Sequence, residues 1–558
     1  MLSNMGNWFY VIITTFCIGY AFSQLVKKVL SLTFRRADSI LMTGLVIATV
    51  YAEIWSLFGG VGLAANGVLV VLCMAIVLRW HKELQKDLSS ICARISITRW
   101  VVIAGLFLLW SYFASRGYMA YDSDLYHGQS IRWIEEYGVV KGLGNLHERF
   151  AYNSSFFALS ALYSMKFMLG QSLHTLNGYW AFLLSVTTLD IAESWKRRKM
   201  ILSDYARVAA IYYLTTICDE VVAPTSDFAI MCMILWIVIK WLDMLEREKE
   251  YNDVSETEGN GIAPYALLCV AGVYALTLKL TAGLILLLLL KPAYLLIREK
   301  RGKEISFYLL LGVLVAAPWF ARTVLISGYL VYPLETLDLF SFDWKMHPQV
   351  VAVDAANIET WARGLYQTAL VDVPITQWMP NWFRTQLTGT EKLLILADVA
   401  GILLTFCYAI SVFVKNNWQK LDYLLVMVTV LSSYLFWQFS APMVRYGYAY
   451  ILFGAALPFG YLMMAIGKDR ICYAGLLLYG IYKLWMVGDY AWEMRTDGYY
   501  VRQEEYGIYE LEPYEVEGIT FYYNPNGDRT GYAPFPAGPS QANITLRGEG
   551  LQDGFRFR

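Results

Sequence analysis

Long apolar runs are the feature of this chain that most restricts its fold. A helix needs about 20 mostly apolar residues to cross the hydrocarbon core of a bilayer. About 14 such stretches occur, near residues 7–26, 39–58, 62–80, 100–116, 174–194, 204–219, 224–243, 262–278, 280–297, 305–321, 393–414, 421–438, 447–467 and 471–488. Composition agrees, because 57% of the 558 residues are apolar and only 16% are charged. The sequence therefore predicts an all-α polytopic membrane protein.

Lysine and arginine gather in every second loop between these stretches. The pattern begins at Lys27 and Lys28 and is still in phase at Lys415 and Lys420. Because cytoplasmic loops are enriched in Lys and Arg, we expect these loops inside the cell and both termini outside the cytoplasm. This alternation of basic and non-basic loops holds only if residues 152–170 do not cross the membrane. This moderately apolar stretch is therefore predicted to be an amphipathic helix at the outer interface.

Three outer regions, residues 117–173, 322–392 and the C-terminal tail, are too long to be simple connectors. Regions of this length usually carry function or are disordered. Tryptophans in the second region and the dense Tyr, Gly and Pro of the tail favour ordered structure close to the membrane. We divide the chain into N-terminal transmembrane helices at 1–99, a transmembrane core at 100–488 and a small extracytoplasmic segment at 489–558.

Charge and motif content exclude several classes of function. The chain carries 45 Lys+Arg and 46 Asp+Glu, which does not suit a surface that neutralises nucleic-acid phosphates. We find no P-loop, dinucleotide-binding or serine-hydrolase motif in a credible context. The eight cysteines fall in or beside apolar stretches or on the expected cytoplasmic side, so no outer disulfide is predicted.

Two aspartates one residue apart, Asp122 and Asp124, follow the fourth predicted span directly, and Tyr126 and His127 come next. Carboxylates at this boundary can take a proton from a hydroxyl acceptor, or hold a divalent cation against a phosphate leaving group. The alternative is a solvated loop in which an aspartate caps a helix. Residues 128–139 then predict an amphipathic helix along the outer leaflet.

Three cations, Lys279, Arg322 and Arg445, fall on the expected outer side, against the general charge bias. Ionisable residues at the edges of spans are costly and indicate function. Three exceptions on one side suggest a shared anionic ligand such as a lipid phosphate. For each residue alone, extension of the side chain to the headgroups is the alternative. Asp227 flanks a further predicted outer turn.

These features together resemble the GT-C glycosyltransferase superfamily, which includes protein O-mannosyltransferases and the lipid A aminoarabinose transferase. The likeness rests on many spans, an acidic motif in the first large outer loop and basic residues near later spans. Residues 318–322, Pro-Trp-Phe-Ala-Arg, and 327–333 look like a stretch common in that superfamily. A closer resemblance is to an uncharacterised family of bacterial multi-pass membrane proteins, through residues 126–127, 133–138, 142–147, 153–156, 343–345 and 527–532.

The resemblance implies a GT-C-like fold in a bacterial inner (plasma) membrane. It further implies inverting transfer of a sugar from a polyprenyl-phosphate donor to a glycan, lipid or protein acceptor at the outer leaflet. Asp122 or Asp124 would be the general base, and the pair would hold Mg²⁺ or Mn²⁺ if the reaction uses a cation. The expected substrate-binding residues are Tyr126, His127, His147, Lys279, Arg322 and Arg445.

Two other functions fit the sequence. A flippase or transporter for lipid-linked glycans is expected to carry ionisable residues near the middle of the membrane in broken helices, whereas here they collect at one face. A non-catalytic assembly protein for envelope glycans would tolerate loss of Asp122 and Asp124 but not loss of the tail.

Overall fold

This computed structural model describes residues 1–251, 261–416, 420–467 and 469–558, and 71% of it is helical. Ten helical stretches of the described residues are long and apolar enough to cross a membrane, as expected for a polytopic membrane protein. They are α1 (Leu2–Leu30), α2 (Ala37–Ser56), α3 (Leu63–Ala93), α11 (Ser226–Tyr251), η6 (Leu280–Leu289) continued by α13 (Leu290–Arg298), α14 (Gly302–Ser327), α17 (Gly389–Val414), α18 (Leu421–Ser440), α19 (Val444–Ile466) and α20 (Asp469–Glu493).

Four shorter helices occupy the remaining predicted spans. They are α4 (Ile97–Phe113), α8 (Leu176–Thr188), α10 (Leu202–Thr216) and α12 (Ala263–Leu278). At 1.5 Å per residue these helices rise roughly 20–26 Å, less than the ~30 Å of a hydrocarbon core. Helices therefore occur in all the predicted stretches, and the number that cross the membrane stays a prediction.

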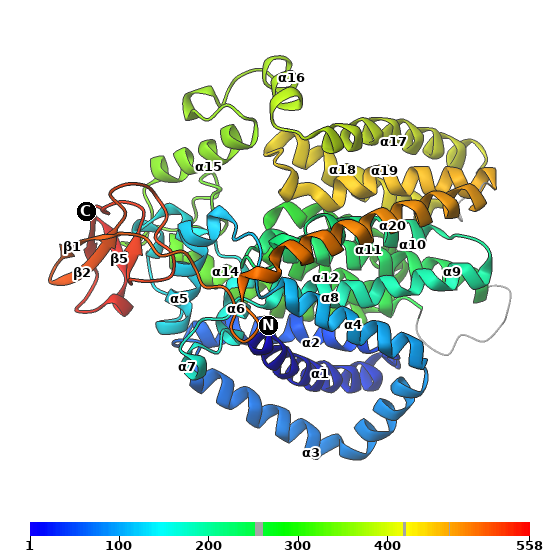
Figure 1. Cartoon of the computed structure of the whole chain (residues 1–558), viewed down its shortest axis with the longest axis horizontal. Coiled ribbons are helices and arrows are strands. Elements are labelled where there is room, and N and C mark those ends of the chain that lie inside the picture. The colour runs from blue at the N-terminus through cyan, green and yellow to red at the C-terminus, as the bar shows by residue number, and fades with distance from the viewer. Residues whose placement is uncertain (252–260, 417–419, 468) are drawn as a thin grey trace.

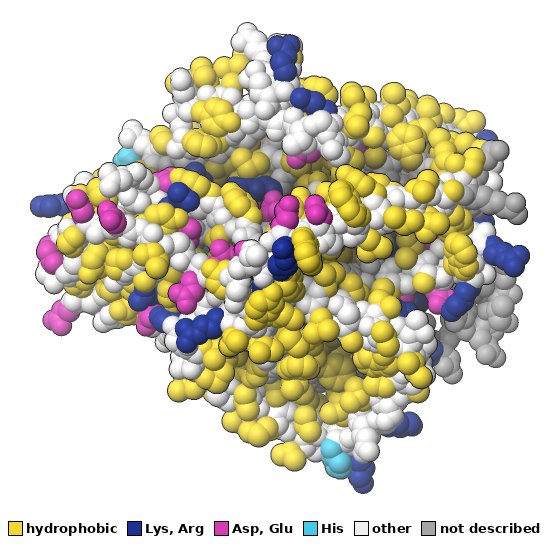
Figure 2. Space-filling model, in the orientation of Figure 1, with side chains coloured by type: hydrophobic (Ala, Val, Ile, Leu, Met, Phe, Trp, Pro, Cys, Tyr) yellow, Lys and Arg dark blue, Asp and Glu magenta, His cyan; other side chains and the backbone are white. Residues whose placement is uncertain are grey.

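Large apolar side chains cover the flanks of the bundle (Figure 2). Leu78 of α3, Leu309 of α14, Leu403 of α17 and Leu478 of α20 are all more than half exposed. Soluble proteins rarely expose contiguous apolar surface of this extent. These faces are suited to contact with lipid chains.

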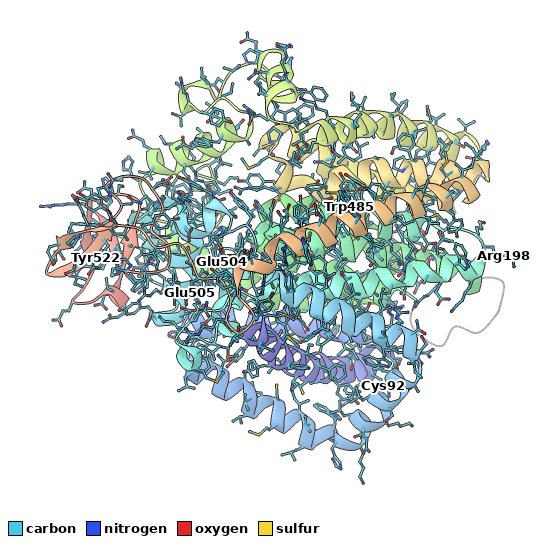
Figure 3. All side chains as sticks on the ribbon, in the orientation of Figure 1. Cys92, Arg198, Trp485, Glu504, Glu505 and Tyr522 are labelled. Carbon is cyan, nitrogen blue, oxygen red and sulfur yellow. The ribbon has the colours of Figure 1, made fainter. Side chains whose placement is uncertain are left out.

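Both chain termini lie toward one end of the helix bundle (Figure 1). The N-terminal amine donates to the carbonyl oxygens of Tyr499 and Arg502 over 2.8 and 3.1 Å, so both the N-terminus and the tail lie at one end. Arg198 and Cys92 lie toward the opposite end from Glu504 and Tyr522 (Figure 3). We call the assembly of residues 117–173, 322–392 and 489–558 the cap, and the opposite end the basic end.

The cap is built from short helices and two small sheets. Its helical elements are η1 (Ser123–His127), α5 (Gly128–Glu136), η2 (Leu143–Asn145), η3 (Glu148–Ala151), α6 (Ser155–Tyr163), α7 (Lys166–Leu169), α15 (Pro348–Ala362), η7 (Thr368–Leu370), α16 (Ile375–Thr385), η9 (Met494–Asp497) and η10 (Leu551–Asp553). In the tail, β1 (Glu512–Val516) pairs antiparallel with β2 (Ile519–Tyr523), which pairs parallel with β3 (Ala537–Gly538). A second sheet pairs β4 (Ile544–Leu546) antiparallel with β5 (Phe555–Phe557).

One hydrophobic core joins the three regions of the cap. Trp133 of α5, Met346 before α15, and Phe521 and Phe555 of the tail are buried in the same cluster. Burial of side chains of this size contributes about 1.5–3 kcal/mol each. The three long regions therefore fold together, which agrees with the ordered structure predicted for them.

The prediction of an amphipathic interfacial helix at residues 152–170 is wrong for α6, and only the short helix α7 at the end of the stretch exposes apolar side chains. All nine residues of α6 are buried, and the helix packs between α2 and α5. Its sequence is apolar on every side, which suits burial inside protein rather than one-sided contact with an interface. The predicted amphipathic helix at 128–139 does occur as α5, but the tail covers its polar side, where Arg132 donates to the carbonyl of Tyr532.

A network of ion pairs holds the basic end together. Nζ of Lys240 in α11 lies 2.6 Å from Oδ2 of Asp38 in α2. Arg36 and Arg99 both pair with Asp190 of η4 (Leu189–Ile191), which leads into α9 (Ala192–Arg197). The contacts join helices that are distant in sequence.

Candidate functional site

The turn after α4 carries the acidic motif. Residues Ser123–His127 form a single π-helical turn, η1, that continues directly as α5. Such turns are rare and occur frequently at functional sites. Asp122 precedes the turn and Asp124 lies within it, and the two carboxylates have different partners.

Asp122 belongs to a cluster of four charged side chains from four separate parts of the chain. Nη2 of Arg445, at the start of α19, donates to Oδ2 of Asp122 over 2.5 Å. Nε of Arg445 lies 3.4 Å from Oδ2 of Asp227, in the first turn of α11. Nζ of Lys279, between α12 and η6, donates to Oδ1 of Asp227. We call Asp122, Arg445, Asp227 and Lys279 the charge cluster.

Aromatic rings border the charge cluster. The ammonium of Lys279 lies 3.4 Å from the ring centroid of Tyr446, and the guanidinium of Arg445 lies 5.2 Å from it. Cation–π contacts contribute about 0.5–2 kcal/mol and help to fix both cations. The side chains of Arg445 and Lys279 stay 39% and 23% exposed, so a ligand can reach them.

Burial and neighbouring charges set the ionisation of the groups in the cluster. Burial is the largest single effect on Asp122 and opposes its ionisation, but the charges and the hydrogen bond of its neighbours, Arg445 foremost, together outweigh burial and lower the pKa of this carboxyl. Burial lowers the pKa of His127 to about 4, although the charges of Asp122 and Asp227 oppose the shift. Nδ1 of His127 is buried and has no hydrogen-bond partner among the described residues. At neutral pH the site therefore combines an ionised Asp122 with a neutral His127.

Asp124 faces the tail and not the charge cluster. Its Oδ1 accepts from the N–H of Gly507 and its Oδ2 from the hydroxyl of Tyr509, both over 2.9 Å. Its carbonyl oxygen accepts from the N–H groups of Thr530 and Gly531 over 2.9 and 2.8 Å. Asp124 is thus one attachment point between residues 117–173 and the tail.

Arg322 is buried in a separate contact. Its Nε donates to Oδ1 of Asn153 over 2.9 Å, and its Nη1 donates to the hydroxyl of Ser56. Trp319, one turn earlier in α14, donates to the carbonyl of Asn153. The Pro-Trp-Phe-Ala-Arg stretch therefore joins α14 to the first outer region and to α2.

His147 also has a local role. Its Nδ1 accepts from the backbone N–H of Arg149 over 2.9 Å and so caps η3. The structure therefore brings together five of the predicted site residues, and leaves Asp124, His147 and Arg322 in neighbouring contacts. The five are Asp122, Tyr126, His127, Lys279 and Arg445.

Comparison with known proteins gives a family. A family model described as a domain of unknown function, DUF8201, matches residues 1–452. The chain belongs to the DUF8201 family. No curated protein and no solved structure matches the chain. The DUF8201 range contains the whole charge cluster and ends within α19, so the tail that binds Asp124 lies beyond it.

A second polar group adjoins the charge cluster. The charge of Arg149 also lowers the pKa of Asp122. Nη1 of Arg149 lies 3.2 Å from Oδ1 of Asp354 in α15. Oδ2 of Asp354 accepts from the hydroxyls of Tyr152 and Tyr332 over 2.6 and 2.8 Å. Beside Asp354 is an open pocket with a volume of about 280 Å³.

The two aspartates of the motif do not fit a shared cation site. Asp122 binds Arg445, and both carboxylate oxygens of Asp124 accept hydrogen bonds from the tail. Across the described residues, no three His, Cys, Asp or Glu side chains gather as metal ligands. We therefore assign no step to a divalent cation.

Sequence reasoning missed Asp398. This residue lies within the apolar run of α17, is 1% exposed, and has no hydrogen-bond partner for either carboxylate oxygen in the described part of the chain. It packs against Gly454 of α19, whose carbonyl lies four residues before Pro458. Since proline has no N–H, it leaves the Gly454 carbonyl without its usual helical donor. The sequence signal was a single aspartate inside a predicted span.

Proposed function

We propose that the protein transfers a sugar from a polyprenyl-phosphate-linked donor to a cell-envelope acceptor, with inversion at the anomeric carbon. The observation that carries this proposal is the contact of ionised Asp122 with Arg445, beside Lys279, at the cap end of an apolar helix bundle. A base and two cations in one partly exposed cluster are what a phosphate-leaving-group transfer needs.

The chemistry follows from the positions of these groups. The Asp122 carboxylate accepts the proton of an acceptor hydroxyl, whose oxygen then attacks the anomeric carbon of the donor. The bond between this carbon and the phosphate oxygen breaks, and its electron pair leaves with the polyprenyl phosphate. Lys279 and Arg445 stabilise the phosphate as it departs. In the structure both cations bind Asp227, so the donor phosphate would compete with Asp227 for them.

The apolar surface of the bundle supports a lipid-linked donor. Large hydrophobic side chains face outward over most of the length of α17 and over residues 309–314 of α14. A polyprenyl chain would remain among the membrane lipids while its phosphate reaches Lys279 at the cap end. A water-soluble sugar nucleotide would not need an apolar surface to reach the site.

We place the cap outside the cytoplasm of a bacterial inner membrane, with both termini on that side. The support is the positive-inside rule, since the loops at the basic end carry the Lys and Arg clusters. In this orientation the charge cluster lies near the outer leaflet, where polyprenyl-linked sugars and envelope acceptors meet.

Asp398 favours a second candidate, a flippase or transporter of lipid-linked glycans. It lies about 14 Å along α17 from Gly389, near the middle of that 26-residue helix. An intramembrane carboxyl next to a proline-containing helix is typical of transport pathways. If this candidate is correct, loss of Asp398 abolishes movement of the lipid-linked glycan, and loss of Asp122 does not.

The test uses the full-length protein in nanodiscs with synthetic short-chain polyprenyl-phosphate sugars and an extract of envelope acceptors. Release of polyprenyl phosphate and gain of labelled sugar in the acceptor are measured together. We expect Asp122→Asn to lower both by at least about a hundredfold. The matched control is Asp343→Asn, an acid of the cap that pairs with Arg547 and is 47% exposed. Equal activity of wild type and Asp122→Asn would reject the proposal.

A further inference from the structure

The pocket beside Asp354 has a mixed lining of polar side chains and two valines that the transfer chemistry does not use. It is lined by Glu148 of η3 and by one face of α15, formed by Gln349, Val350, Val353, Asp354 and Asn357. Its volume of about 280 Å³ lies just below the usual range of ligand pockets, about 300–1,000 Å³. A space of this size would hold one or two sugar units.

Asp354 connects the pocket to Arg149. It lines the pocket and pairs with Nη1 of Arg149 over 3.2 Å. The charge of Arg149 in turn acts on the carboxyl of Asp122. The pocket therefore lies on the same side of the molecule as the base of the proposed reaction, with Asp354 and Arg149 between them.

The charges of the lining select against an anion. None of its six described residues is a lysine or arginine, while Glu148 and Asp354 are acids and only Asp354 is paired with a cation. A donor phosphate would be repelled here and drawn to Lys279 and Arg445. The side chains of Gln349 and Asn357 each offer a donor and an acceptor, which suits the hydroxyl groups of a neutral sugar.

An exposed aromatic side chain extends the same face of α15. Trp361 lies one turn after Asn357, is 55% exposed, and packs against Tyr366 with the ring planes at 86°. A flat apolar ring next to a polar pocket offers a surface for stacking a sugar ring beyond the first.

We propose that this pocket binds neutral sugar residues of a glycan acceptor. The inference rests on the proposed function and narrows it, because it selects a glycan over a lipid or protein acceptor. In this arrangement the pocket and Trp361 hold the end of a glycan chain, and a hydroxyl of its terminal sugar reaches Asp122.

The first experiment measures binding alone, so it does not depend on transfer. Full-length protein in nanodiscs is applied to an array of bacterial envelope oligosaccharides that contains neutral and uronic-acid-bearing chains of equal length. We expect binding to neutral chains and exclusion of the acidic ones. Gln349→Ala and Asn357→Ala should each weaken binding roughly tenfold, the effect of one lost hydrogen bond. Gln377→Ala, which truncates an exposed glutamine of α16 outside the pocket, is the matched control and should bind as wild type.

The second experiment separates this inference from the proposed function. In the transfer assay, Asn357→Ala should raise the KM for the acceptor while kcat and the KM for the donor stay unchanged. An unchanged acceptor KM together with an inactive Asp122→Asn would overturn the inference and leave the transferase proposal standing. If Asn357→Ala weakens binding to the array but the wild type transfers no sugar, the glycan pocket is supported and the transferase proposal is rejected. Binding only to acidic chains, or to none, would overturn the inference directly.

Discussion

Asp122 and Arg445 lie 323 residues apart in the chain, and their side chains are in contact over 2.5 Å. The contact joins the first turn after α4 to the start of α19, so both ends of the membrane domain contribute to one site. Arg445 also reaches Asp227, through which Lys279 enters the cluster. The proposed base and the proposed phosphate ligands are therefore fixed relative to one another by the packing of α11, α12 and α19.

Replacement of Asp122 and replacement of Asp124 should have different effects on transfer activity. Asp122→Asn keeps the size of the side chain but removes the base, so transfer should fall by two to four orders of magnitude, as expected for loss of a general base. Asp124→Asn should retain most activity because Asp124 binds the tail. Initial rates with protein amounts matched by size-exclusion chromatography test this. Equal losses in both variants would contradict the assignment.

The segment of the tail around Gly507 should loosen when its attachment to Asp124 is removed. Asp124→Ala leaves the partly buried N–H of Gly507 and hydroxyl of Tyr509 without their acceptor, at a cost of about 1 kcal/mol for each hydrogen bond lost. Limited proteolysis should then cut near residues 498–511 faster than in wild type, while the bundle stays intact. Asp528→Ala, which removes an exposed partner of Tyr121, serves as the control. The prediction fails if both variants are cut at the wild-type rate.

Sequence patterns located the helices and part of the site for a simple reason. Long apolar runs report burial away from water, and Lys279 and Arg445 could be grouped with Asp122 because all three occur at span ends on one predicted side. The binding of Asp124 by Gly507, 383 residues away, has no counterpart in local sequence. The burial of α6 was missed because its apolar sequence fits either lipid or protein surroundings.

Stability should depend on pH through His127. Its pKa is lowered from 6.5 to about 4 by burial, so the folded protein binds this proton less readily than the unfolded chain does. The folded state is therefore destabilised as pH falls from 6.5 toward 4, by an amount on the order of 3 kcal/mol. His127→Gln removes this titration. Thermal melts of both proteins between these pH values should show a smaller decrease for the variant, and parallel decreases would exclude His127 as a cause.

Two buried aspartates should respond to truncation in opposite directions. Asp38 binds Lys240 over 2.6 Å and Arg36 over 3.1 Å, and Arg36 also pairs with Asp190, so Asp38→Ala leaves the buried ammonium of Lys240 unpaired and should destabilise the protein by about 3–5 kcal/mol. Asp398 has no hydrogen-bond partner among the described residues, so Asp398→Ala removes an unsatisfied polar group without orphaning another. The melting temperature of Asp398→Ala should equal or exceed that of wild type, since such a group costs about 1–3 kcal/mol to bury.

Side chains that stabilise a fold so poorly are retained for function. Melts in nanodiscs test the stability effect, and glycan translocation by Asp398→Ala tests the function. Destabilisation of Asp398→Ala to the level of Asp38→Ala would mean that Asp398 has a structural partner, and the transporter alternative would lose its support.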